Sequence, residues 1–140
     1  MLEKNSFSNY LPHAGSMLLI ENIIKFDNES LKAKAIIDHL NPTPMHSGEK
    51  LGVFSLIEWG AQAVGIHLAL SSQELLQNKS TGYISQVVNA RIFKRWVDNG
   101  LINIDVQQLI YTTNVTQYRF CISQNNNACL QSEISLAFNL

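Results

Sequence analysis

Charged side chains are scarce in this chain of 140 residues: they make up 15% of it, against about 25% in typical soluble proteins. Ten basic and eleven acidic residues leave a net charge of −1, so the sequence lacks the basic surface that nucleic acids and anionic membranes require. Asparagine (14 residues) and glutamine (9 residues) supply much of the polar surface instead. The composition therefore predicts no nucleic-acid partner.

Long apolar runs and cysteines are scarce as well. No stretch approaches the roughly 18 to 20 unbroken apolar residues of a membrane span, and residues 1–6 lack the basic-then-apolar layout of a signal peptide. The two cysteines, Cys121 and Cys129, are too few for a disulfide framework. No linker or repeat divides the chain. We expect a single domain over residues 1–140, without a membrane span, in the cytoplasm.

The first third of the chain predicts a hairpin followed by a loop. Residues 17–26 are apolar and β-branched, residues 27–30 are turn formers, and residues 31–37 return with strand-like alternation. A loop is expected at residues 39–50. The two prolines of the Asn-Pro-Thr-Pro sequence at 41–44 have no backbone N–H to donate, and each disfavours helical backbone angles at the residue before it.

One long helix is predicted from Gly52 to about Leu76, where apolar residues recur at helical spacing. Glycine and alanine stand where an exposed helix would carry Glu and Lys. Such small side chains let a neighbouring backbone approach closely. We therefore expect this helix to be buried on most sides and wrapped by a sheet.

The last 58 residues are strand-like. The predicted strands, separated by turn formers, are 83–96, 101–111, 116–123 and 128–138. Two strands, one helix and four antiparallel strands predict an α+β fold, in which a long helix packs against a curled sheet of about six strands. The free edge of such a sheet commonly pairs with a second copy.

The motifs of several chemistries are missing. The sequence has no Gly-rich phosphate loop, no paired-cysteine metal motif and no serine in a nucleophile elbow. Cys121 falls in a predicted strand, which favours a core position. Acid–base chemistry remains, and its candidate residues are His13, His39, His46, Glu58 and His67.

Glu58 is the only charged residue between positions 51 and 72. A carboxylate in an apolar helix is costly to bury unless it is hydrogen-bonded, paired or protonated, and a general acid must be protonated at neutral pH. The alternative is that Glu58 lies on a solvent-exposed side of the helix. Gln62, four residues on, shares its face and can orient it. His67 points almost the opposite way and is assigned to the core or the surface.

Three segments resemble the bacterial 3-hydroxyacyl-ACP dehydratases of fatty acid synthesis. Leu-Pro-His at 11–13 with the strand at 17–23 is similar to their opening. Residues 56–65 resemble their helix motif, in which Glu is followed four residues later by Gln, and residues 90–97 resemble their Ala-x-Phe-x-x-Pro-Val strand. The resemblance implies the hotdog fold, a long central helix wrapped by a curled antiparallel sheet, which agrees with the arrangement predicted above.

The resemblance implies a lyase reaction, in which water leaves a (3R)-3-hydroxyacyl thioester on acyl carrier protein (ACP) and trans-2-enoyl-ACP forms. It implies that a histidine takes the proton next to the thioester carbonyl and that the helix carboxylate, here Glu58, handles the departing hydroxyl. The two residues come from different subunits of a dimer. This chemistry needs no metal and no cofactor.

The position of the histidine departs from the common family form. That form has Gly-His-Phe-Pro-Gly with its histidine 14 residues before the Glu, where this chain has Pro44. A divergent subgroup from aryl polyene pathways resembles this chain in having a histidine at the end of the second strand, followed by Asn/Asp-Pro. The match makes His39 the expected base, with His46 as the alternative. His13 is expected to fix the N-terminal segment.

The resemblance also implies sites for the thioester oxygen and for the carrier. The backbone N–H groups of Val53 and Phe54, at the start of the helix, are the candidates for binding the oxyanion. Lys94 and Arg95, the only adjacent basic pair, are the candidates for docking an acidic ACP. A homodimer or higher homo-oligomer is expected, and a heterodimer with another hotdog protein is the alternative.

Two other functions stay open. A hotdog thioesterase would use a carboxylate and the same helix-end donors to hydrolyse an acyl-CoA or acyl-ACP, although the Leu-Pro-His opening and the Ala61-Gln62 pair favour a dehydratase. A non-catalytic hotdog subunit would support an active partner in a heterodimer or only bind acyl chains, and the missing Gly-His-Phe-Pro-Gly motif keeps that interpretation open.

Overall fold

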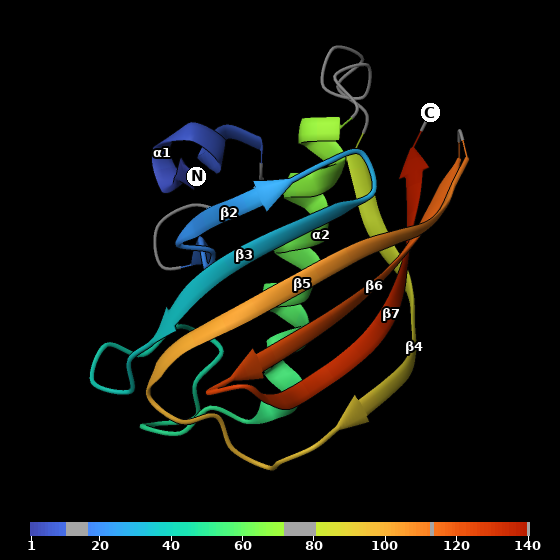
Figure 1. Cartoon of the computed structure of the whole chain (residues 1–140). Helices are drawn as coiled ribbons and strands as arrows, with labels where there is room; N and C mark the ends of the chain where they lie inside the picture. Colours follow the sequence, from blue (N-terminus) through green and yellow to red (C-terminus); the bar gives the residue numbers. More distant parts are fainter. Residues whose placement is uncertain (11–16, 72–80, 113, 140) are drawn as a thin grey trace.

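The computed structural model describes residues 1–10, 17–71, 81–112 and 114–139. Within these residues, seven strands form one antiparallel sheet in the order β1-β2-β3-β5-β6-β7-β4 (Figure 1). The strands are β1 (Leu2–Glu3), β2 (Asn22–Phe26), β3 (Ser30–Ile37), β4 (Thr81–Ile92), β5 (Gly100–Tyr111), β6 (Val115–Gln124) and β7 (Asn127–Asn139). The helical elements are α1 (Lys4–Phe7), the 3₁₀ turns η1 (Ser8–Tyr10) and η3 (Val53–Leu56), and α2 (Ile57–Ser71).

The sheet curls around α2, which crosses behind β3, β5, β6 and β7 in Figure 1. Most of the helix is buried, as its small residues predict. The closest approach is at Gly60, where an added Cβ would lie 2.3 Å from the ring of Phe120 on β6. By length and composition η3 and α2 together, Val53–Ser71, could cross a membrane, but 61% of this segment lies inside the fold. The helix is therefore the core element of the domain.

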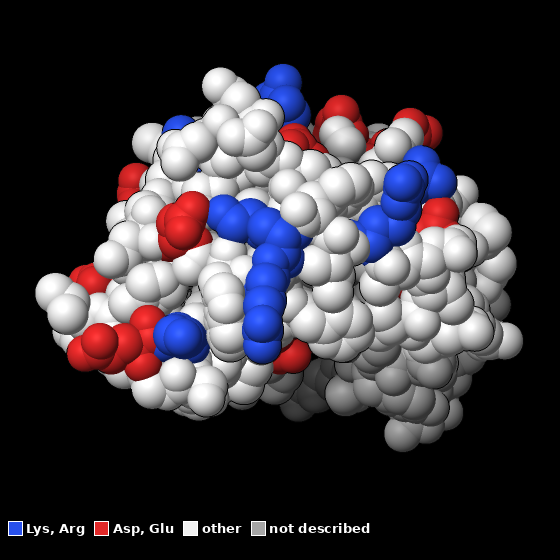
Figure 2. All heavy atoms as spheres, turned by 90° about the horizontal axis from the view of Figure 1, so that it is seen from below, with Lys and Arg blue, Asp and Glu red and all other residues white. Residues whose placement is uncertain are grey.

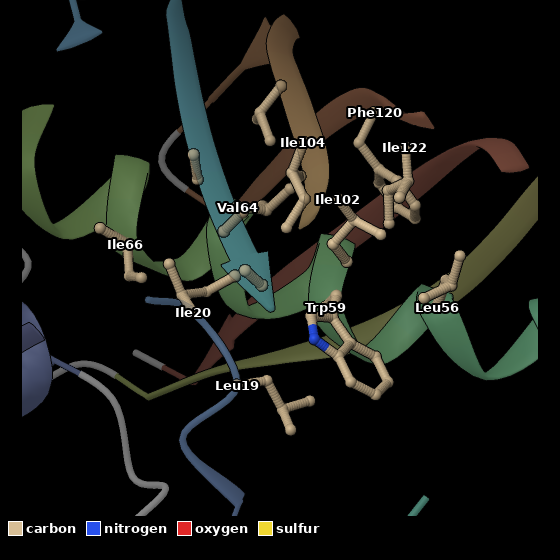
Figure 3. Packing of buried hydrophobic residues seen from close by; sticks show 14 of the residues in the cluster. Leu19, Ile20, Leu56, Trp59, Val64, Ile66, Ile102, Ile104, Phe120 and Ile122 are labelled. Carbon is tan, nitrogen blue, oxygen red and sulfur yellow. The ribbon is translucent and has the colours of Figure 1, made fainter. Parts of the chain in front are cut away.

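Alternate side chains of the strands point towards α2 and fill the sheet side of the core. In β6 the even-numbered residues, including Tyr118, Phe120 and Ile122, face α2 and are fully buried, because successive side chains of a strand point to opposite faces. Two isoleucines of β5, Ile102 and Ile104, join them around the helix (Figure 3). The α+β fold with one helix wrapped by a curled sheet is thus confirmed.

The structure corrects several details of the prediction. The strand predicted at 17–26 begins only at Asn22. Of the described residues directly before it, Met17 and Leu19 bond to the Gln62 side chain on α2, and only Glu21 donates a backbone hydrogen bond to β3. The strand predicted at 83–96 ends at Ile92. Cys121 lies on the outer face of the sheet and is partly exposed, whereas Cys129 is buried. The last predicted turn of the helix, residues 72–76, lies outside the described residues.

Candidate active site at the start of the central helix

His39 stands at the end of β3, where the strand gives way to the loop. Its backbone N–H donates to Oδ1 of Asn99 at 2.7 Å. Asn99 directly precedes β5, the neighbour of β3 in the sheet. The carboxylate of Asp38 accepts from Leu40 N and Asn41 Nδ2, which closes the turn after the strand. The backbone of His39 is therefore held by the ends of two paired strands.

Both ring nitrogens of His39 have partners. Nε2 lies 2.9 Å from the carbonyl oxygen of Val97, and Nδ1 lies 3.2 Å from Nε2 of His46. The two imidazoles meet edge to face, with their centroids 5.4 Å apart. The structure thus brings together the two histidines that the sequence offers as alternative bases.

His46 is held by the loop itself. Its Nδ1 accepts from the backbone N–H of Thr43 at 2.9 Å, and the Thr43 hydroxyl lies 3.0 Å away. Burial lowers the pKa of His46, and the neighbouring His39 lowers it further. His46 therefore favours its neutral form.

Residues 93–97 connect this histidine pair with the start of the helix. The backbone N–H of Val97 donates to the Leu51 carbonyl at 2.9 Å, and the N–H of Val53 donates to the Arg95 carbonyl at 3.0 Å. The assignment of Val53 as an oxyanion donor is therefore wrong, because its N–H is already satisfied by a neighbouring chain segment. Phe54, the next residue of η3, remains the predicted donor.

An apolar groove opens between η3 and the segment after β4. Its volume is about 590 Å³. It is lined by Gly52, Val53, Phe54 and residues 92–96. Phe54 is 58% exposed and Phe93 49%, which is high for side chains of this size. The groove therefore exposes apolar surface beside the start of the helix.

Cations lie along this groove. The Lys50 Nζ and the Arg95 guanidinium each lie 5.2 Å from the ring centroid of Trp96, and Arg91 lies 5.7 Å from that of Phe93. Figure 2 views the molecule from below and shows basic side chains near the middle of this face, with acidic ones around them, mostly towards its rim. Of the predicted docking pair, Arg95 thus stacks on an aromatic ring of the groove.

Lys94, the other member of the predicted docking pair, is bound differently. Its Nζ lies 2.8 Å from Oδ2 of Asp98, and this carboxylate raises the pKa of the lysine. Both side chains are partly exposed, so the ion pair is weak and salt-sensitive. The sequence did not indicate Lys50 or Trp96 as members of this surface, because they are 46 residues apart and no short motif joins them.

Glu58 lies in the first turn of α2 and is partly buried. Gln62, one turn on, is 1% exposed. Its amide accepts from Leu19 N at 2.9 Å and donates to the carbonyl of Met17, so it ties the segment before β2 to the helix. That Gln62 also orients Glu58 stays a prediction.

The other histidines separate into one core residue and one undescribed residue. His67 is fully buried and bonded to Tyr118, which confirms that it lies away from the candidate site. His13, with the Leu-Pro-His motif, lies outside the described residues. In the part of the chain that the structure describes, no three His, Cys, Asp or Glu side chains come together to hold a metal ion.

The fold is that of the hotdog class. A chain of the dehydratase heterocomplex ApeI:P from Xenorhabdus doucetiae superposes with a TM-score of 0.79 at 18% identity, covering 96% of this chain and 91% of the other. A thioesterase from Haemophilus influenzae gives 0.64 at 18% identity, covering 99% and 91%. A hypothetical thioesterase with coenzyme A from Streptococcus pneumoniae gives 0.69 at 10% identity, covering 97% and 96%.

The family follows from the sequence itself. The model of the ApeP-like family, described as ApeP dehydratase, matches residues 5–138. The chain belongs to this family, which confirms the resemblance to the dehydratases, including those of aryl polyene pathways. A comparison with curated protein sequences gives no significant match.

Proposed function

We propose that this protein is a dehydratase that removes water from a (3R)-3-hydroxyacyl thioester carried by ACP, and that it works together with a second hotdog subunit. The observation that carries the proposal is the placement of His39. Strand ends hold its backbone, Val97 holds its ring, and the segment 93–97 that supplies this carbonyl also lines the groove at the start of the helix. A base held by rigid backbone beside an apolar groove suits a reaction on an acyl chain.

In the proposed mechanism, the thioester carbonyl lies at the start of the helix, where the N–H of Phe54 stabilises the developing negative charge. His39 takes a proton from the carbon next to that carbonyl. The carboxyl of Glu58 from the other subunit donates a proton to the hydroxyl as the C–O bond breaks, so water leaves and the double bond forms. No redox step is involved.

The partner subunit is proposed to pair along β4. This strand of twelve residues forms the end of the sheet beside β7. Its exposed side chains include Val87 and Ile92, and a long, apolar sheet edge favours pairing with another strand. The partner is a second copy or a different hotdog protein. The heterocomplex of the ApeI:P relative supports the second form.

A hotdog thioesterase is the second candidate, because two of the structural relatives carry that name. One experiment separates the candidates. The purified chain, alone and mixed with a hotdog partner subunit, is incubated with 3-hydroxyacyl-ACP and with acyl-ACP, and the carrier is weighed by mass spectrometry.

A dehydratase converts the hydroxyacyl carrier to a species lighter by one water and leaves acyl-ACP intact. A thioesterase releases the bare carrier from both substrates, and a non-catalytic subunit changes neither. Glu58→Gln should lower dehydration by about 10² or more while the unfolding midpoint stays close to wild type or rises slightly, because a neutral isostere removes the acid without changing the packing. Wild-type activity in this variant would assign Glu58 to a purely structural position.

A further inference from the structure

The side chain of Gln124, the last residue of β6, holds the backbone of Asp98 by two hydrogen bonds. Oε1 of Gln124 accepts from the Asp98 N–H at 3.2 Å, and Nε2 donates to the Asp98 carbonyl at 2.8 Å. A backbone N–H only donates and a carbonyl only accepts, so only this orientation of the amide fits. Gln124 is 3% exposed. A buried side chain thus gives Asp98 the pair of backbone bonds that a residue of a neighbouring strand gives in a sheet.

The residues on either side of Asp98 are the ones that hold His39. The carbonyl oxygen of Val97 lies 2.9 Å from Nε2 of the imidazole, and Oδ1 of Asn99 accepts from the His39 backbone N–H at 2.7 Å. The carboxylate of Asp98 is bound to Lys94 instead. Both anchors of His39 therefore belong to the tripeptide 97–99, and Gln124 holds the middle residue of that tripeptide.

The support of Gln124 is a tight hairpin turn. Asn125 and Asn126 join β6 to β7 with φ values of 52° and 64°. Positive φ at both central residues is the pattern of the two-residue turn that matches the twist of a hairpin, and asparagine tolerates this conformation. Gln124 itself pairs with Asn127 across the turn. The hairpin therefore gives the Gln124 side chain a well-defined starting point.

We infer that Gln124 is a positioning residue for His39. The inference rests on the proposed function, in which His39 is the base. In the resting chain the N–H of His46 occupies the lone pair on Nδ1 of His39, so the base acts only after this contact opens. Val97 and Asn99 keep His39 in place while it is open, and the bond from Nε2–H to the Val97 carbonyl strengthens when the imidazole takes up a proton and becomes a cation. Gln124 holds both anchors and does not touch the reacting atoms.

The competing explanation is that Gln124 only stabilises the fold. Gln124→Met separates the two, because it keeps the length of the side chain and removes both bonds to Asp98. The matched control is Gln108→Met. Gln108 lies on β5 and donates to Thr116 and Tyr118, so its loss affects stability without reaching the tripeptide 97–99.

The kinetic test uses 3-hydroxyacyl-ACP and the full chain with its partner subunit, at a temperature where each variant is fully folded. Gln124→Met should lower kcat about tenfold or more and leave KM within about twofold, because a displaced base slows the proton transfer without weakening substrate binding. Gln108→Met should keep kcat within about twofold of wild type. Wild-type kcat in Gln124→Met, or an equal loss of kcat in both variants, would overturn the inference.

A second measurement does not depend on activity. Hydrogen exchange of the His39 amide, followed in ¹H–¹⁵N spectra of the labelled chain, reports how often its bond to Asn99 opens. Exchange of this amide should be about tenfold faster in Gln124→Met, relative to the core amides of β5 and β6, and unchanged in Gln108→Met. The Nε2 resonance of the His39 imidazole should shift in Gln124→Met only.

Unchanged exchange of the His39 amide in Gln124→Met would overturn the inference whatever the enzyme assay shows. A wild-type chain that dehydrates no substrate with its partner subunit would instead refute the proposed function, and faster exchange in Gln124→Met would then still establish that Gln124 holds His39. The two failures are therefore distinguishable.

Discussion

The hydroxyl oxygen of Tyr118 lies 2.7 Å from Nδ1 of His67, and both residues are fully buried between α2 and β6. Nε2 of the same imidazole lies 2.8 Å from the Asp27 carbonyl, and Gln108 donates to the Tyr118 hydroxyl at 3.2 Å. The carbonyl requires a proton on Nε2, so Nδ1 accepts from Tyr118. A neutral His67 therefore satisfies every partner in this network.

We predict that this network makes folding sensitive to mild acid. Burial lowers the pKa of His67, opposed by the bond to the Asp27 carbonyl and by the Asp27 charge. The unfolded chain takes up a proton near pH 6.5 that the folded chain resists. Its contribution to stability is complete above about pH 6.5 and is lost as the pH falls towards the lowered folded value, by up to about 1.4 kcal/mol for each unit between the two pKa values.

Urea unfolding of the wild type at about pH 7.5, 6.5 and 5.5 tests this, because ordinary carboxyl groups in model peptides titrate below this range, near pH 4. His67→Gln should flatten the profile. His46 acts in the same direction, since burial also lowers its pKa, and His46→Gln measures its share. Equal stability of the wild type across this range would contradict the prediction.

The contact between Gly60 and Phe120 predicts a strong effect of a single methyl group. Gly60→Ala should lower the free energy of unfolding by about 1 to 3 kcal/mol, because the added Cβ would overlap the Phe120 ring. The measurement is a double-mutant cycle with Phe120→Leu, which replaces the aromatic ring with a smaller side chain. If Gly60→Ala is as costly in the Phe120→Leu background as in the wild type, the overlap with the ring is not the cause.

Substitution of Gln62 distinguishes an effect on protein stability from an effect on catalytic turnover. Gln62→Leu should lower the free energy of unfolding by about 1 to 3 kcal/mol, because the buried N–H of Leu19 and the Met17 carbonyl lose their partner. Turnover is measured at a temperature where the variant is fully folded. A small change in kcat would limit Gln62 to this structural clip, whereas a loss of about tenfold or more would support the predicted orientation of Glu58.

We predict that the basic side chains beside the groove bind the acidic carrier protein through electrostatic attraction. Reversing Lys94 and Arg95 to Glu should raise KM for 3-hydroxyacyl-ACP about tenfold, equivalent to about 1.4 kcal/mol, because an acidic carrier loses two favourable charges. The effect should weaken with salt and be absent for a small pantetheine thioester. Lys50→Glu, which changes the other cation on Trp96, should act in the same direction.

Lys25→Glu, an exposed substitution on β2, is the matched control and should leave KM unchanged. Equal increases in KM for 3-hydroxyacyl-ACP and for a 3-hydroxyacyl pantetheine thioester would show that the substitutions damage the groove itself. An equal effect of Lys25→Glu would reduce the result to net charge.

The sequence alone was sufficient for α2 and for strands β2 to β7, although not for all of their ends, and it indicated neither β1 nor α1. The small residues of α2 and the alternation in β3, β5 and β6 reflect spacing within one segment, and such spacing is set by helix and strand geometry. The adjacency of Glu58 and Gln62 on one helix face has the same origin. The two candidate bases, His39 and His46, were likewise identified from the motifs around them.

Only the tertiary structure showed which polar groups of the candidate site already have a hydrogen-bond partner within the chain. The N–H of Val53 donates to the Arg95 carbonyl, and the side-chain amide of Gln62 accepts from the N–H of Leu19. The two alternative bases, His39 and His46, form a hydrogen-bonded pair. Each of these contacts depends on the path of a loop or of a strand connection, which local spacing does not specify. A buried polar group forms a hydrogen bond with a partner that the path of the chain places within reach. The free-energy cost of burying the group without a partner exceeds the net contribution of one hydrogen bond.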